Sequence, residues 1–85
     1  MVKFNYVITD EVGIHARPAG LLVKTAQQLS SKVTISKGDK SGDAKKIFSI
    51  MGLCAKQGDE ITVTVEGENE AEDAKTLEAF LKENL

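Results

Sequence analysis

The chain has 85 residues, a formal net charge of −2 at pH 7, one cysteine and no tryptophan. This length fits one domain, residues 1–85, with little room for a deep substrate pocket. The charge balance and the few aromatic residues exclude a nucleic-acid interface, and a single cysteine excludes an intramolecular disulfide or a multi-cysteine zinc site. No apolar run approaches the roughly 20 residues of a membrane span, and the chain start lacks a signal-peptide core. We therefore expect a small cytoplasmic protein that acts on other proteins at its surface.

Apolar side chains alternate with mostly polar ones from Val2 to Ile8, which is the period of a half-buried strand. From Ala16 to Leu29 the apolar residues recur at intervals of three and four, so an amphipathic helix is predicted there. Pro18 fits only the first turn of this helix, where a missing N–H is tolerated. The helix is therefore expected to start close to Ala16.

The middle of the chain predicts two strands and a short helix. A strand over 33–36 is separated by a turn from a shorter strand over 40–44. The segment 47–53 is too rich in apolar residues to be a loop. We expect it to form a short helix that stops near Gly52 or Gly58.

The last part of the chain predicts a strand and a longer helix. Apolar residues alternate with threonines over 61–65, and Gly67 ends this strand. Asn69 can cap a helix whose first turn is acidic, as the helix dipole favours. The buried stripe of this helix consists of Ala74, Leu77 and Leu81. The order β-α-β-β-α-β-α usually places all helices on one face of a largely antiparallel sheet.

The stretch Gly13–Ala19 holds the only histidine, His15, and the only arginine, Arg17, at the point where a loop becomes a helix. A helix N-terminus presents free N–H groups and a partial positive charge, which stabilise a phosphate and favour a neutral, nucleophilic histidine ring. We therefore predict a nucleophile at His15, a backbone anion site at Ala16 and Arg17, and phosphate pairing by the Arg17 guanidinium. The competing interpretation is a weak helix cap or a solvated histidine. A metal role is not favoured, because no cluster of further His or Cys residues accompanies His15.

The sequence Gly-Ile-His-Ala-Arg-Pro-Ala at 13–19 resembles the active-site motif of the histidine-containing phosphocarrier (HPr) family of the bacterial phosphoenolpyruvate:sugar phosphotransferase system. The resemblance covers essentially the whole chain, including the segments 45–53 and 66–68. It implies an α+β open-faced β-sandwich, with three helices on one face of a four-stranded, mainly antiparallel sheet. It also implies that His15 carries a phosphoryl group on Nδ1 and that Arg17 assists.

The resemblance further implies that the phosphoryl group comes from phosphoenolpyruvate through enzyme I and passes to the A domains of sugar-specific enzymes II. It implies neither a cofactor nor a metal. A monomer is the simplest expectation for a protein that docks repeatedly. Alternatives are a specialised paralogue, either nitrogen-type or serving one pathway, and a regulatory module that binds a transcription factor or an enzyme. A small ligand-binding domain is a third class, but no pocket with convergent polar groups is expected.

The predicted helix at 47–53 is apolar on more than one face. We expect Ile50 and Leu53 to lie in the core. So short a helix in so small a domain cannot bury apolar residues on every side, so a second apolar face is expected at the surface. Helical spacing places on that second face Ile47, Phe48 and Met51.

The resemblance assigns this second face, together with Gly20 and Lys24, to the surface that docks partner proteins. Such a surface needs a modest apolar patch with a charged rim. Lys24, Lys45 and Lys46 could supply a positive rim. The plain alternative for each lysine is a solvated side chain.

Two positions depart from the family pattern. In many Gram-positive members a serine follows the lysine equivalent to Lys45 and is phosphorylated by an ATP-dependent kinase, whereas this chain has Lys46 there. Ser49 lies one helical turn later and does not align, so control by that kinase is not expected. Val12 stands where members often have a polar residue able to hydrogen-bond near the histidine. Cys54, the single cysteine, is expected to be a small core residue.

Overall fold

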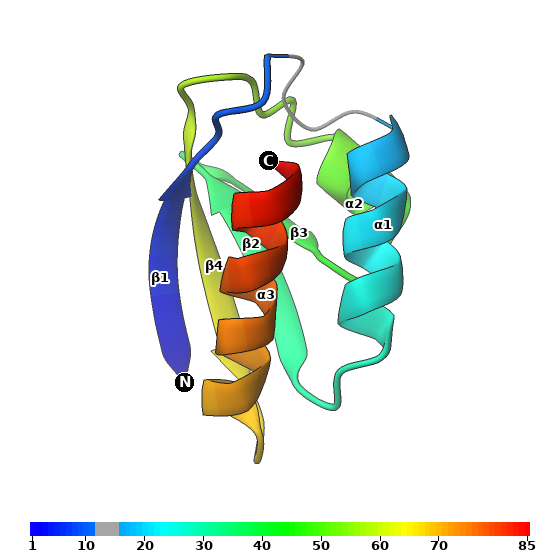
Figure 1. Ribbon diagram of the computed structural model, residues 1–85, viewed down its shortest axis with the longest axis vertical. Coiled ribbons are helices and arrows are strands. Elements are labelled where there is room, and N and C mark those ends of the chain that lie inside the picture. Colours follow the sequence, from blue (N-terminus) through cyan, green and yellow to red (C-terminus); the bar gives the residue numbers. More distant parts are fainter. Residues whose placement is uncertain (12–15) are drawn as a thin grey trace.

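The computed structural model describes residues 1–11 and 16–85. Within them the elements follow the predicted order β-α-β-β-α-β-α. The strands are β1 (Val2–Val7), β2 (Lys32–Lys37), β3 (Lys40–Asp43) and β4 (Glu60–Glu66), and the helices are α1 (Ala16–Gln27), α2 (Ile47–Met51) and α3 (Glu70–Asn84). Figure 1 shows α3 in front of the strands, with α1 beside it and α2 behind α1.

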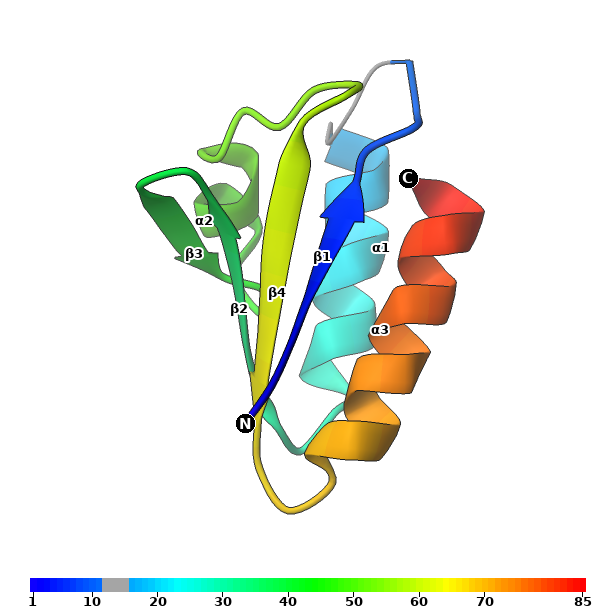
Figure 2. The same cartoon turned by 90° about the vertical axis from the view of Figure 1, so that its left-hand side faces the viewer.

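The strands form one sheet in the order β1-β4-β2-β3, and every neighbouring pair is antiparallel. In the middle of the sheet, Val63 of β4 pairs with Phe4 of β1 on one side and with Ile35 of β2 on the other. Figure 2, which turns the molecule by a quarter, shows α1 and α3 side by side on one face of the sheet. The third helix, α2, contacts α1 and the edge strand β3. The predicted open-faced β-sandwich is confirmed.

The core lies between the sheet and the helices. Every second residue of β4 points into it, and Ile61, Val63 and Val65 are at most 1% exposed. Burial of one such side chain stabilises the fold by about 1.5–3 kcal/mol. The helices contribute the residues that their periodicity predicts, namely Ala19, Leu22, Ala26, Ile50, Leu77 and Leu81.

The helix α1 starts where Pro18 predicts but ends at Gln27, two residues before the predicted end at Leu29. After Gln27 the backbone tightens, because the N–H groups of Gln28 and Leu29 donate to the carbonyls three residues earlier, at 3.2 and 3.1 Å. The apolar period continues through Leu29 because this side chain still packs against the core after the helix has ended. The periodicity thus reports burial rather than helical backbone at that point.

Asn69 occupies the N-cap position of α3 as predicted, but its side chain does not cap the helix. Its backbone has φ −105° and ψ 26°, away from the extended conformation that side-chain capping requires. The amide Nδ2 instead donates to the hydroxyl of Ser30 at 3.4 Å, in the connection between α1 and β2.

A buried polar pair, which the sequence did not indicate, lies beside this contact. Ser31 is 0% exposed and Asp73, in the first turn of α3, is 8% exposed. The Ser31 hydroxyl and N–H both donate to Oδ2 of Asp73, at 2.5 and 3.3 Å. Gly67 lies against the same serine with φ +156°, and a Cβ there would lie 2.9 Å from the Ser31 hydroxyl oxygen. The start of α3 is therefore fixed to the connection that follows α1.

The prediction that Cys54 lies in the core is wrong, because its side chain is exposed. Cys54 has a left-handed backbone with φ 53° in the turn after α2. Its neighbours Leu53 and Ala55 are buried at 1% and 2% exposure. The left-handed turn lets both neighbours enter the core while the residue between them faces out. The carbonyl of Cys54 accepts a hydrogen bond from Nζ of Lys37 at 3.0 Å.

Candidate functional site

The motif 13–19 crosses the boundary of the described residues. His15, the predicted nucleophile, and Val12 lie outside them, and of Ala16 only the backbone is described. Ala16 is the first residue of α1, so the helix begins directly after the histidine in sequence, as predicted. Arg17 is exposed, whereas Pro18 and Ala19 are buried. The first turn of α1 therefore has one apolar side packed inward and Arg17 at the surface.

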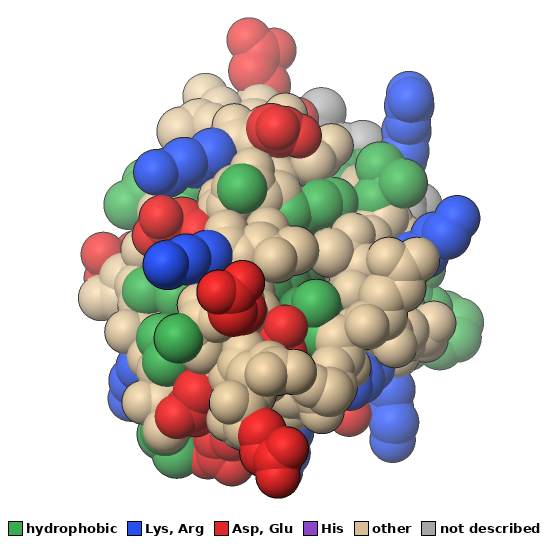
Figure 3. All heavy atoms as spheres, turned by 60° about the horizontal axis from the view of Figure 1, so that its bottom comes forward, with side chains coloured by type: hydrophobic (Ala, Val, Ile, Leu, Met, Phe, Trp, Pro, Cys, Tyr) green, Lys and Arg blue, Asp and Glu red, His purple; other side chains and the backbone are tan. Residues whose placement is uncertain are grey.

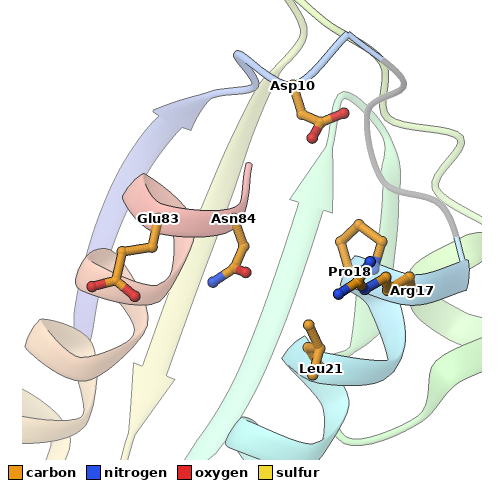
Figure 4. A pocket seen from close by; sticks show the side chains of 6 residues that line it. All are labelled: Asp10, Arg17, Pro18, Leu21, Glu83 and Asn84. Atoms are coloured by element: carbon orange, nitrogen blue, oxygen red, sulfur yellow. The ribbon is translucent and has the colours of Figure 1, made fainter.

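Arg17 lines an open hollow of about 270 Å³ between the start of α1 and the end of α3. Figure 4 shows Arg17, Pro18 and Leu21 along α1, and Glu83 and Asn84 across from them on α3. Asp10 lies above the gap between the two helices (Figure 4). The hollow brings together polar groups from α1, α3 and the connection after β1, which the sequence did not indicate. No local pattern marks Asp10, Glu83 or Asn84, because only the fold places them beside Arg17.

The predicted apolar face of α2 is at the surface. Phe48 is 86% exposed and Met51 is 39% exposed, while Ile47 is partly buried against the core. A Cβ placed on Gly20 of α1 would lie 3.9 Å from Cδ1 of Ile47, so these two residues adjoin. Lys24 is exposed on the same helix as Gly20. The fold thus brings together, from two helices, residues that the family resemblance assigns to docking.

Leu21 is an exposed apolar residue that the sequence patterns did not single out. It is 43% exposed, although it follows Gly20 directly and lies in an apolar stretch of α1. Helical periodicity could have marked it, since the buried residues Leu22 and Ala26 lie on a different side of the helix.

The side chain of Lys45 is held by a hydrogen bond to the main chain, so it contributes less to a positive rim than predicted. Its Nζ donates to the carbonyl of Leu29 at 3.0 Å, and its own carbonyl accepts a hydrogen bond from Nε2 of Gln27 at 3.0 Å. Lys45 therefore holds the segment before α2 against the end of α1. Lys46, the next residue, is exposed at the N-cap position of α2, where its side chain makes no capping hydrogen bond.

Charge is distributed unevenly over the helices. The segments 16–38 and 44–58, which contain α1 and α2, have no aspartate or glutamate, whereas α3 has five acidic residues and two lysines. Figure 3 views the molecule from its lower end, and most of the acidic side chains lie over its middle and left. Basic side chains lie on both sides of Figure 3, but few acidic ones accompany them on the right, the side on which α1 and α2 lie in Figure 1. The predicted docking residues therefore lie on the positive side of an acidic chain.

Among residues 1–11 and 16–85, no group of three or more His, Cys, Asp or Glu side chains could hold a metal ion. In the same part of the chain no helix is long and apolar enough to cross a bilayer.

Comparison with known proteins agrees with this geometry. The family model of the PTS HPr component phosphorylation site matches residues 2–83. Phosphocarrier protein HPr of Mycoplasma capricolum is 46% identical over 74 residues, which cover 87% of this chain and 82% of that protein. The crystal structure of HPr from Thermoanaerobacter tengcongensis has a TM-score of 0.93 at 36% identity, covering 99% of this chain and 94% of that one.

A second kind of relative has the same fold. Crh, the Bacillus subtilis catabolite repression containing protein, has a TM-score of 0.78 at 34% identity, covering 100% of this chain and 98% of that one. That protein forms a dimer with a swapped domain, so the expectation of a monomer is not confirmed for this chain. The family match spans nearly the whole sequence, and both the relative and the structures cover most of it. This chain belongs to the HPr family of phosphocarrier proteins of the phosphotransferase system.

Proposed function

We propose that this protein carries a phosphoryl group on His15, which it accepts from phospho-enzyme I and passes to the A domain of sugar-specific enzymes II. The observation that carries the proposal is the start of α1 at Ala16, directly after the only histidine, with Arg17 exposed in the first turn. Membership of the HPr family supports the same assignment. The whole chain, residues 1–85, would act as one domain in the cytoplasm.

The proposed chemistry needs a nucleophile and groups that stabilise the negative charge of the phosphoryl group. The Nδ1 lone pair of His15 attacks phosphorus, and the bond to the donor breaks as the new P–N bond forms, so the donor keeps its bonding electron pair. The first N–H groups of a helix have no partner within it, so those of Ala16 and Arg17 can bind phosphoryl oxygens. The Arg17 guanidinium adds charge-assisted hydrogen bonds. The next acceptor attacks the same phosphorus and releases the neutral ring.

The proposed docking surface consists of an apolar patch with a positive rim. The patch is formed by Gly20, Leu21, Ile47, Phe48 and Met51, and the rim by Arg17, Lys24 and Lys46. Phe48, which is 86% exposed, is the most exposed member of the patch, and an exposed apolar patch, unlike a single exposed apolar residue, marks an interaction site. The partner surface would offer an apolar pocket for Phe48 with acidic residues around it.

The test is phosphorylation with phosphoenolpyruvate and enzyme I. The wild type is expected to gain one phosphate that is labile in acid and stable in base, and His15→Ala is expected to gain none. His15→Ala must keep the circular dichroism spectrum of the wild type, so that loss of the adduct reports the missing nucleophile. A wild type without such an adduct would refute the proposal. The remaining interpretation would then be a regulatory module that binds a transcription factor or an enzyme.

A specialised paralogue is the second candidate. It is favoured by Lys46 at the position of the regulatory serine and by the similarity to Crh over the whole chain. Such a paralogue would use the same His15 but serve other partners. Transfer from the phosphorylated protein to a panel of A domains from different enzymes II separates the two, since a general carrier phosphorylates several and a specialised one phosphorylates one or none.

A further inference from the structure

The chain that leads from β1 into the motif is held by one oxygen atom at the end of α3. The main-chain oxygen of Leu85 accepts hydrogen bonds from the N–H groups of Thr9 and Asp10, at 2.5 and 2.8 Å. It also accepts one from the hydroxyl of Thr9, at 2.9 Å. Leu85 is 2% exposed, so its side chain in the core fixes the position of this oxygen. The contact joins residues 76 positions apart in sequence.

The same segment is held from its other side by the loop before β4. The carbonyl of Thr9 accepts a hydrogen bond from Nε2 of Gln57 at 3.2 Å. The residue before it, Ile8, accepts from the N–H of Gly58 at 2.8 Å and donates to the carbonyl of Asp59 at 3.0 Å. Thr9 therefore contacts both flanking elements through its own polar groups.

The loop that makes these contacts is itself well fixed. The carboxylate of Asp59 accepts hydrogen bonds from the N–H of Lys56 at 2.9 Å and from Nζ of Lys37 at 3.2 Å. These two hydrogen bonds lower the pKa of Asp59 below its ordinary value, and the one from the N–H of Lys56 has the larger effect. Gln57 thus extends from a loop whose ends are fixed by charge-assisted hydrogen bonds.

Thr9 lies at the near end of the connection that leads from β1 to the histidine. Asp10 lines the hollow opposite Arg17 (Figure 4), and His15 comes six residues after Thr9 in sequence. The far end of this connection is fixed by the buried Pro18 and Ala19 of α1, and the near end by Thr9. Phosphoryl transfer depends on alignment, and small misplacement of a reacting group lowers its rate strongly.

We propose that Thr9 is a positioning residue for phosphoryl transfer. Its hydroxyl donates to the Leu85 oxygen and its carbonyl accepts a hydrogen bond from Gln57. These two hydrogen bonds fix the point from which the chain enters the motif, and Thr9 itself does not contact the phosphoryl group. The inference rests on the proposed function of His15. The hydroxyl is the testable part, because among the three hydrogen bonds to Leu85 it alone comes from a side chain.

The experiment measures kcat and KM for phosphorylation by enzyme I of the wild type, Thr9→Val, Thr9→Ser and a matched control, Thr62→Val. Thr62 lies in β4, away from the motif, and its hydroxyl donates to Oδ1 of Asn5 at 2.9 Å. Both valine variants therefore lose one side-chain hydrogen bond of a threonine. Thr9→Val is expected to lower kcat about two- to tenfold, the effect of one hydrogen bond, with KM unchanged because the docking patch is intact.

Thr9→Ser keeps the hydroxyl and is expected to restore kcat to within about twofold, while Thr62→Val transfers like the wild type. If Thr9→Val lowers Tm more than Thr62→Val does, Gln57→Leu provides the second variant and is expected to lower kcat in the same direction. The proposal is overturned if Thr9→Val matches Thr62→Val, if Thr9→Ser is as slow as Thr9→Val, or if only KM rises. Failure of the proposed function differs from all of these, because the wild type would then gain no acid-labile phosphate.

Discussion

At the scale of single residues, the fold depends on a polar pair as well as on its apolar core. Asp73→Ala would leave the buried N–H and hydroxyl of Ser31 without their acceptor. We expect unfolding by urea to show a loss of about 1–3 kcal/mol, the penalty for buried unsatisfied donors. The matched control is Glu72→Ala, which removes an exposed carboxylate from the same first turn of α3 and should change stability by less than about 0.5 kcal/mol. Equal effects of the two substitutions would contradict the role of the pair.

Phe48 is the most exposed apolar residue of the proposed docking surface. Phe48→Asp should leave the fold intact, because the side chain is 86% exposed, and should raise KM for enzyme I at least about tenfold, as loss of a central aromatic contact does. Ala79→Asp, at an exposed position of α3, adds the same charge away from the patch and should transfer normally. Unchanged kinetics of Phe48→Asp would show that partners dock elsewhere.

Lys46 bears on regulation. A lysine has no hydroxyl to phosphorylate, so incubation with the serine kinase of Gram-positive systems and ATP should add no phosphate, as mass spectrometry would show. Ser49 is only partly exposed, and its carbonyl lies against Gly42. Lys46→Ser restores the hydroxyl and serves as the positive control. A phosphate on Ser49 or on any neighbouring serine of the unmodified protein would refute the expectation.

At the scale of elements, the position of α2 depends on its close approach to β3. In this position Ile47 of α2 adjoins Gly20 of α1, so the two helices form one docking surface. A Cβ on Gly42 would lie 2.6 Å from the carbonyl oxygen of Ser49, so Gly42→Ala must push the helix away. We expect a loss of about 1–3 kcal/mol in unfolding free energy and weaker docking through the displaced Phe48. Gly20→Ala is the control for stability, because its Cβ would meet only Ile47 at 3.9 Å, and this substitution should stabilise α1 by about 0.5–1 kcal/mol. A stable Gly42→Ala would mean that the two elements can separate without strain.

The elements also show what sequence reasoning can reach. Strong periodicity and one proline predicted every strand and helix in order, and the start of α1 at Ala16. The end of α1 and the role of Asn69 were predicted wrongly, because tertiary contacts decide them: Leu29 packs on the core after the helix, and Asn69 bonds to Ser30. The prediction that Cys54 is buried was wrong because the pattern of apolar residues does not reveal the left-handed turn at this position.

The residues of the candidate site also fall into two groups: those whose position the sequence predicted, and those that only the fold brings together. Arg17 and the exposed face of α2 follow from spacing within one segment, so the sequence predicted where they lie. Asp10 and Glu83 reach the hollow beside Arg17 from other elements, and Thr9 meets Leu85 across 76 positions. Such juxtapositions exist only in the folded chain, so no pattern along the sequence could predict them.

At the scale of the whole molecule, charge is separated although the net value is only −2. The molecule extends 33 × 23 × 20 Å, whereas charges in water are screened over about 8 Å at physiological ionic strength. A partner that approaches α1 and α2 therefore meets the exposed Lys24 and Lys46, whereas Arg17 shares its hollow with Asp10 and Glu83. This arrangement favours encounter with acidic partner surfaces in one orientation, with the apolar patch facing them.

The proposed function requires that His15 hold a phosphoryl group in transit between two proteins. A direct measurement loads the protein with ³²P from labelled phosphoenolpyruvate through enzyme I, removes enzyme I, and adds an A domain of an enzyme II. We predict that the label sits on His15, leaves it on addition of the A domain, and appears on that domain, and that His15→Ala takes up none. Label that stays on the protein, or that His15→Ala accepts as well as the wild type, would contradict the proposed function.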